Sequence, residues 1–261
     1  MKVNILGVEV DKITLSEAEN QILKWVKSGG KHYIVTPNIE FVMLARQDPE
    51  FRKVLNKADM AIPDSARFGW ADYQLRQKKL LNRIISWPLF MMPPSFDFPT
   101  TTGTDLMAKL IAISAEKGFT VGFLGGQPKV AIKLAERLKK KYPKLKIGMV
   151  LSDVTVDTDG EVTAGQRQLL SQELPLDILF VGLGQRKQEG WISKNLDKFP
   201  AKVMIGVGGA FDYLSDNVSR APEWMRNLGL EWLYRVILQP WRIKRFGNLV
   251  KFVFLVLFFD K

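Results

Sequence analysis

Short apolar runs alternate with longer segments of helical periodicity, and this alternation limits most strongly what the chain can fold into. Six runs have the length and composition of buried strands: 32–35, 58–62, 119–124, 146–151, 176–181 and 202–207. The segments between them carry apolar residues at helical spacing. Strands separated by helices are typical of an α/β protein with a mostly parallel sheet flanked by helices.

Helix signals support the same arrangement. Thr14 to Glu17 has the spacing of a capping box, and its helix should end at Gly29-Gly30. Thr104 is expected to cap a helix that reaches Gly118, and Pro128 to occupy the first position of the next helix. Further helices are predicted near 41–45, 164–173 and 187–195.

Polar or glycine-rich loops follow the predicted strands. Asn38 and Asp64 come after the first two, at the edge where open α/β sheets place their ligands. Gly125-Gly126 follows the third strand, and a glycine turn before a helix can present backbone N–H groups to a phosphate. Such turns more often serve chain geometry alone. Phosphate binding and a purely geometric role are therefore both possible interpretations of Gly125-Gly126.

The amino-acid composition excludes several kinds of catalytic and metal site. The 261 residues include no cysteine, which excludes disulfides, a thiolate nucleophile and a Cys-based zinc site. The single histidine, His32, lies in an apolar run and is expected to be a strand residue without a catalytic role. The N-terminus lacks the features of a signal peptide, so a cytoplasmic location is expected.

The net charge of +11 favours an anionic partner, and its distribution indicates which one. From residue 218 to 261 there are eight basic and three acidic residues, interspersed with tryptophans and followed by the apolar run 249–259. Basic groups beside indoles suit a membrane surface better than nucleic acid, and the run is shorter than the ~20 residues that a spanning helix needs. The alternative is a terminal helix docked on the core or on another subunit.

The expected organisation is an α/β catalytic core over 1–210 and a basic, aromatic helical appendage over 211–261 that binds the membrane. An apolar, proline-rich insertion at 84–101 interrupts the core, and its prolines exclude a continuous helix. Such an insertion either contacts a membrane or partner or packs on the protein itself.

Four motifs, in this order, resemble the WecG/TagA/CpsF glycosyltransferase family. They are Thr36-Pro37-Asn38 with Glu40; Pro63-Asp64; Gly182-Leu183-Gly184 with Lys187-Gln188-Glu189 and Trp191; and Arg220-Ala221-Pro222 continuing through 229–235. The resemblance spans nearly the whole chain. It implies a Rossmann-like core, no cofactor and no metal requirement. It also implies inverting transfer of N-acetylmannosamine or a related sugar from UDP to a polyprenyl-diphosphate-linked GlcNAc, in the synthesis of cell-wall or surface polysaccharides such as teichoic acid.

The resemblance also assigns residues. Asp64 matches the proposed general base, while Thr36, Asn38, Arg83 and Gln188 match substrate-binding positions, and the Gly125-Gly126 turn is placed with them at the donor. Three arginines match residues that hold the acceptor diphosphate from the appendage: Arg235, Arg242 and Arg245. Guanidinium groups suit phosphate better than lysines do.

Departures from the family pattern leave alternatives open. Ser65 replaces the usual glycine after the aspartate, and the insertion separates Arg83 from the Gly103-Thr104-Asp105-Leu106 motif. A binder of lipid-linked diphosphate sugars that has lost catalysis is therefore the competing hypothesis, and self-association also stays open. Asp157-Thr158-Asp159 imitates a metal-binding DxD, but Asp-Gly at 159–160 is better explained as a hairpin turn.

Overall fold

The computed structural model describes residues 1–91, 96, 98–157, 160–162, 175–227, 231–238, 240, 243 and 246–258. For Met91, Arg226, Asn227, Glu231, Trp232 and Arg235 it describes the backbone alone. The predicted helix at 164–173 lies outside these residues.

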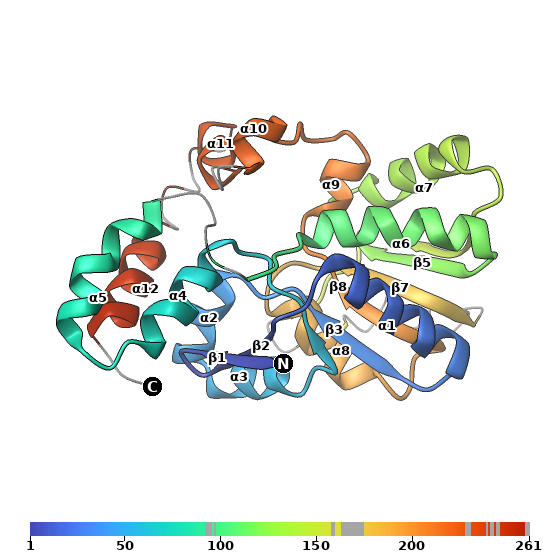
Figure 1. Ribbon diagram of the computed structural model, residues 1–261. Helices are drawn as coiled ribbons and strands as arrows, with labels where there is room; N and C mark the ends of the chain where they lie inside the picture. The colour runs from blue at the N-terminus through green and yellow to red at the C-terminus, as the bar shows by residue number, and fades with distance from the viewer. Residues whose placement is uncertain are drawn as a thin grey trace.

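A parallel sheet of six strands forms the centre of the protein (Figure 1). Its spatial order is β4-β3-β8-β7-β5-β6. The strands are β3 (His32–Val35), β4 (Met60–Ala61), β5 (Thr120–Gly125), β6 (Lys146–Leu151), β7 (Leu176–Gly182) and β8 (Ala201–Gly206). The predicted α/β class and all six predicted strands are confirmed, and the second strand is shorter than expected.

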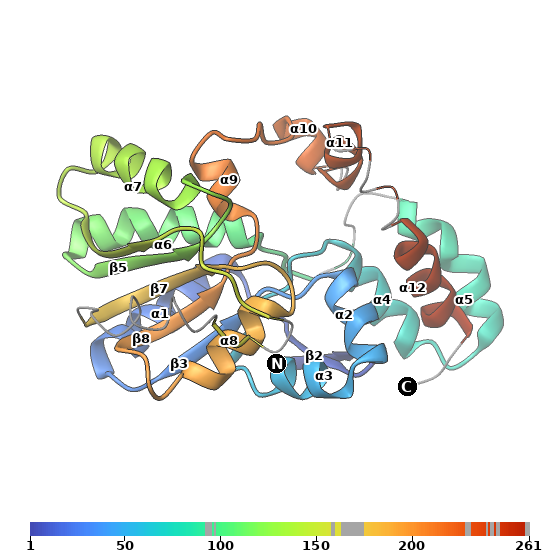
Figure 2. The same cartoon turned by 180° about the vertical axis from the view of Figure 1, so that it is seen from behind.

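Helices cover both faces of the sheet (Figures 1 and 2). One face packs on α1 (Leu15–Ser28), α6 (Gly103–Lys117), α7 (Val130–Lys141) and α9 (Ala210–Leu214). The other packs on α8 (Lys187–Asn195), and the same apolar cluster continues beside the sheet through α2 (Ile39–Gln47), α3 (Pro49–Asn56), α4 (Arg67–Arg76) and α12 (Phe246–Phe258). Burial on both faces explains why the strands are almost wholly apolar.

Capping residues set the helix starts. Thr14 and Glu17 form the predicted capping box of α1, and the Asn38 side chain accepts hydrogen bonds from the first turn of α2. Thr102, rather than Thr104, caps α6, because its hydroxyl accepts from the Asp105 backbone N–H. Pro128 precedes α7 without belonging to it.

Two hairpins flank the sheet. The first, β1 (Lys2–Ile5) with β2 (Val8–Asp11), was not predicted, and it buries its alternate residues against the core. The second supports the turn expected at 159–160, because Val156 pairs antiparallel with Val162 and Gly160 N–H donates to the Asp157 carbonyl. Residues 158–159 themselves lie outside the described part of the chain.

The remaining helices lie in two places, one pair beside α12 at one end of the molecule and the other pair between that end and α9 (Figures 1 and 2). They are α5 (Leu80–Ser86), the 3₁₀ helix η1 (Trp87–Met91), α10 (Glu223–Asn227) and α11 (Glu231–Leu238). The helix α12 packs between α2, α4 and α5, so the last described helix is docked directly on the core. Of the two readings of the apolar tail, docking on the core holds for one face of α12. Among the described helices, none has the length and hydropathy to cross a bilayer.

Candidate functional site at the carboxyl edge of the sheet

The connections of the sheet reverse direction between β5 and β7. From β5 the chain passes through α7 to β6 on one side, whereas from β7 it passes through α8 to β8 on the other. Open α/β sheets bind ligands at such a point, outside the carboxyl ends of the strands. The glycine turns identified from the sequence lie here.

Gly125 lets the two strand ends approach closely. It has a φ of 96°, and a Cβ at this position would lie 2.8 Å from the Gly182 carbonyl oxygen. The next residue, Gly126, donates its N–H to that same carbonyl at 2.8 Å. This N–H group therefore joins the strand ends rather than facing a phosphate, and the Gly125-Gly126 turn shapes the edge through its geometry.

Thr36 ties the end of β3 to the end of β8. Its hydroxyl donates to the Gly206 carbonyl at 3.0 Å, and the residue is only 5% exposed. A Cβ on Gly103 would lie 3.4 Å from this hydroxyl, so the start of α6 is adjacent. Thr36 thus holds together three elements that border the carboxyl edge.

Gln188 acts on the turn after β8. Its Oε1 accepts from the Gly208 backbone N–H at 3.0 Å, and its Nε2 donates to Glu189 Oε1 at 2.6 Å. Gln188 is 1% exposed, so it shapes the site through the Gly208 turn. A Cβ on Gly206 would lie 2.9 Å from both side chains, which explains the glycine there.

Glu189 is a buried carboxyl that the sequence prediction did not assign to the site, although it stands in one of the motifs. Besides Gln188, it accepts the Arg186 backbone N–H at 2.8 Å and so closes the start of α8. Burial raises the pKa of Glu189 to about 7, against the lowering effect of these hydrogen bonds. Burial, together with the charge of Glu189, also raises the pKa of Tyr33 well above its ordinary value.

Asp64 lies at the carboxyl end of β4, where it was predicted. Its backbone N–H donates to the Pro37 carbonyl at 2.9 Å, and the Pro63 carbonyl accepts from the Thr101 backbone N–H at 2.9 Å. The loop that carries Asp64 is therefore fastened both to the loop after β3 and to the segment before α6. Asn38 caps α2 through Oδ1, and its amide nitrogen forms no hydrogen bond within the described residues.

Arg220 was quoted only for the resemblance, and it connects two motifs. Its guanidinium donates to both oxygens of Asp105 and, at 3.1 Å, to the Thr102 hydroxyl. Arg220 and Asp105 lie 115 residues apart, so the pairing had no local signal in the sequence. The segment after α9 is thereby fixed to the start of α6, beside Thr36.

Of the four arginines predicted to bind the substrate or its diphosphate, only Arg83 has a described side chain. Arg83 lies in α5 and is 6% exposed, and its Nε donates to the Gln77 carbonyl at 2.9 Å. Its helix packs on α12 and η1 at the helical end of the molecule. Arg235 belongs to α11 with only its backbone described, and Arg242 and Arg245 lie outside the described residues.

The described residues contain no cluster of three or more carboxylate or histidine side chains that could hold a metal ion. Of the DxD sequence only Asp157 is described, and its Oδ1 accepts the Glu161 backbone N–H at 2.8 Å, as a turn residue does. The other aspartate, Asp159, is not among the described positions.

The sheet, its reversal point and the motif residues along its edge define an open α/β protein of the ligand-binding type. The chain belongs to the glycosyl transferase WecG/TagA/CpsF family, whose model matches residues 3–260. The resemblance found in the sequence is thus confirmed over almost the full length.

Curated relatives include two from Bacillus and one from Staphylococcus. The proteins of Bacillus subtilis (strain 168), Bacillus spizizenii and Staphylococcus aureus (strain MRSA252) are each named N-acetylglucosaminyldiphosphoundecaprenol N-acetyl-beta-D-mannosaminyltransferase. Identity to the first is 31%, covering 87% of this chain and 82% of the relative. The corresponding values are 33%, 86% and 78% for the second, and 28%, 97% and 91% for the third.

Proposed function

We propose that this protein transfers N-acetylmannosamine, or a closely related sugar, from a UDP donor to GlcNAc on a polyprenyl diphosphate. The family and the names of three relatives support the reaction class and the acceptor. The observation that carries the proposal here is the placement of Asp64. Its loop is fastened to the loop of Thr36 and to the segment before α6, at the carboxyl edge of the sheet.

The proposed reaction is a single displacement with inversion. The Asp64 carboxylate accepts the proton of the acceptor hydroxyl while the hydroxyl oxygen bonds to the anomeric carbon. At the same time the bond from that carbon to the donor phosphate oxygen breaks, and UDP leaves with the electron pair. An aspartate side chain suits this step because an ionised carboxylate can accept a proton from a hydroxyl group.

The other site residues have supporting roles in this proposal. Thr36 and Gln188 hold the ends of β3 and β8 in place, and Asn38 offers its amide nitrogen to a sugar oxygen. Arg235, Arg242 and Arg245 are proposed to meet the diphosphate charge, with Arg83 as a further contact. Neutralising the leaving group with arginines and backbone N–H groups requires no metal ion.

The test is turnover of a panel of UDP sugars with a GlcNAc-diphosphate-prenyl acceptor analogue, in the presence of EDTA. We expect product from the native protein and a loss of about 10²–10⁴-fold in kcat for Asp64→Asn. The control is Asp197→Asn, since Asp197 is exposed between α8 and β8.

Each result has a defined meaning. Equal turnover by Asp64→Asn and the native protein would remove the general-base role. Loss of native activity on adding EDTA would contradict metal-independent transfer. Tight binding of the acceptor without turnover of any donor would favour the competing hypothesis, a binder that has lost catalysis.

A further inference from the structure

The helix α5 presents an apolar surface to solvent. Leu81 and Ile85 are 65% and 68% exposed, although their hydrophobicity is that of core residues. Three more large apolar side chains of this region are also exposed: Leu80, Ile84 and Trp87. Contiguous apolar exposure of this kind marks an interaction surface.

The neighbouring helix α12 extends this surface. Its buried face consists of Phe252, Val256 and Leu257, which join the core. Its opposite face is exposed and has one side chain at every fourth position: Phe246, Val250, Phe254 and Phe258. Because α12 packs against α5, two segments about 160 residues apart in sequence build one end of the molecule (Figures 1 and 2).

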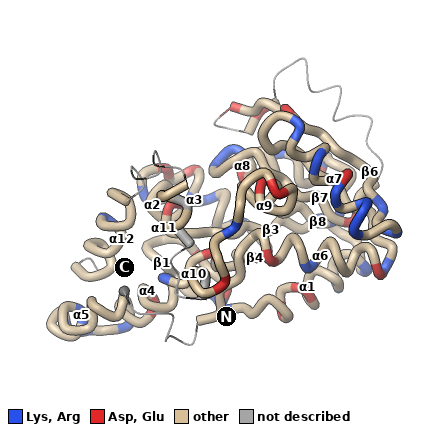
Figure 3. The backbone as a smooth tube through the Cα atoms, turned by 90° about the horizontal axis from the view of Figure 1, so that it is seen from above, with Lys and Arg blue, Asp and Glu red and all other residues tan. Residues whose placement is uncertain are grey.

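The charges of α5, α12 and the segments around them have a single sign. No aspartate or glutamate occurs between residues 73 and 96 or between residues 232 and 259, whereas these two segments contain four and five basic residues. The tubes of α5 and α12 accordingly carry no acidic position in Figure 3. Lys78 and Lys79 are exposed directly before α5, beside the apolar surface.

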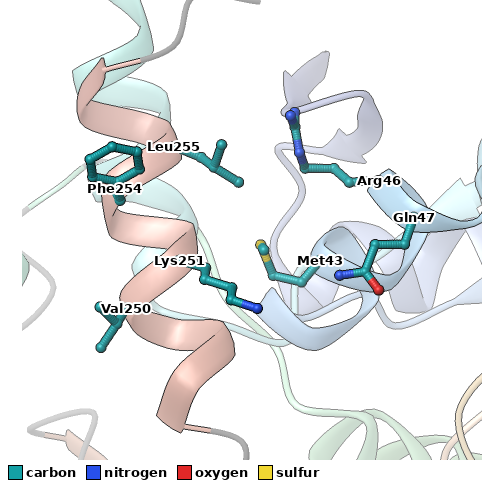
Figure 4. A pocket seen from close by; sticks show the side chains of 7 residues that line it. All are labelled: Met43, Arg46, Gln47, Val250, Lys251, Phe254 and Leu255. Atoms are coloured by element: carbon teal, nitrogen blue, oxygen red, sulfur yellow. The ribbon is translucent and has the colours of Figure 1, made fainter.

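The surface continues into a pocket of about 470 Å³ between α2 and α12 (Figure 4). Val250 and Phe254 of the exposed face line it, and Lys251 reaches from α12 toward Met43 on α2. Arg46 lies across the pocket. Neither Lys251 nor Arg46 forms an ion pair or a hydrogen bond with any residue that the structure describes.

We infer that α5 and α12 together form a surface that docks on a bilayer containing anionic lipids, with α5 as an anchor separate from the C-terminal segment. The apolar side chains would enter the acyl boundary, Trp87 would lie at the interface, and Lys78, Lys79, Arg46 and Lys251 would face lipid phosphates. The absence of acidic residues favours an anionic bilayer over a second copy of this basic chain. The inference rests on the proposed function in one respect: docking on a bilayer would bring the protein to its lipid-linked acceptor.

The test measures partition of the full-length protein onto phosphatidylcholine vesicles with and without phosphatidylglycerol. The variant Leu81→Asp/Ile85→Asp should lower the partition coefficient by a factor of about 10 or more, since each removes an apolar side chain from the bilayer. Ile132→Asp is the matched control, because Ile132 is 45% exposed on α7, away from this end. It should bind like the native protein.

A second variant tests the charges. Lys78→Gln/Lys79→Gln should weaken binding by about tenfold on vesicles with phosphatidylglycerol, and raised salt should remove the difference. On phosphatidylcholine alone the variant should bind like the native protein. Binding of this variant that equals the native level on anionic vesicles would overturn the electrostatic part of the inference.

Turnover of an acceptor with a short, water-soluble prenyl chain separates this inference from the proposed function. The α5 variant should keep native turnover in solution while it loses vesicle binding. Unchanged vesicle binding would overturn the inference whatever the activity. A change in sedimentation velocity of the α5 variant, with vesicle binding retained, would identify the surface as a contact between protein chains.

Discussion

Arg220 holds the carboxylate of Asp105 through two parallel hydrogen bonds, from Nη1 to Oδ1 at 2.6 Å and from Nη2 to Oδ2 at 2.7 Å. This geometry fixes the segment after α9 to the first turn of α6. Because Gly103 at the start of α6 contacts Thr36, the pair also supports the edge of the sheet where Asp64 lies.

Replacing Arg220 by lysine should therefore affect both stability and turnover. Lysine keeps the charge but loses the planar fork that bonds both carboxylate oxygens. In a double-mutant cycle of Arg220→Lys with Asp105→Asn, urea unfolding should give a coupling of about 1 kcal/mol, because the pair is only partly exposed. Turnover of both single variants should fall.

The matched control is the surface pair Lys53–Glu50, three residues apart on α3. Its cycle should give a coupling of about 0.3–0.5 kcal/mol and leave turnover unchanged. Equal couplings in the two cycles would show that Arg220 adds no more than an ordinary surface pair.

Glu189 should make the stability depend on pH in a defined direction. Its folded-state pKa of about 7 lies above the ordinary value of 4.5, so the folded protein holds the proton more tightly than the unfolded chain. The contribution is fully present below about pH 4.5 and is lost as the pH rises through about 7. The loss is about 3 kcal/mol for a shift of this size.

Urea unfolding of native protein and Glu189→Gln from pH 4 to 8 measures this contribution. The native free energy of unfolding should decrease relative to the variant across this range, since glutamine cannot titrate. Glu50→Gln, a change at an exposed carboxylate on α3, serves as the comparison. Parallel curves for native protein and Glu189→Gln would refute the assignment.

Gly125→Ala should disturb the edge of the sheet at the reversal point. The added Cβ would meet the Gly182 carbonyl at 2.8 Å, in addition to the strain of a φ of 96°. We expect a loss of about 2 kcal/mol or more in stability, with weakened donor binding by calorimetry. The control Gly184→Ala has a φ of 86° but meets no atom within 4 Å, so it should cost about 1 kcal/mol. Similar costs for both would show that the contact with Gly182 is unimportant.

Much of the fold was predictable because it depends on local signals. The capping box at Thr14 gave the start of α1, and apolar runs gave six strands. The misplaced start of α6 shows the limit of such signals, since Thr102 and Thr104 are both capable of capping and only their geometry distinguishes them. The β1–β2 hairpin escaped prediction because its strands alternate apolar and polar residues and so form no continuous apolar run.

The candidate site, too, has features that the sequence predicted and features that it did not. Motif positions identified Asp64, Thr36 and Gln188, but not how they act. Thr36 and Gln188 are buried and work through the backbone of β8 and its turn, and these contacts span 170 and 20 residues of sequence. Arg83 was placed by its distance from a motif, and its burial in α5 was not readable from that distance.

The sequence by itself determined the α/β class, the strands, the motifs of the family and the basic, aromatic character of the tail, because each depends on residues close together in the chain. Only the tertiary structure decided the strand order, the pairing of Arg220 with Asp105, the burial of Glu189 and the joining of α5 with α12 into one apolar end. Each of these depends on which distant segments pack together, and the packing minimises exposed apolar area over the whole chain rather than within any one segment.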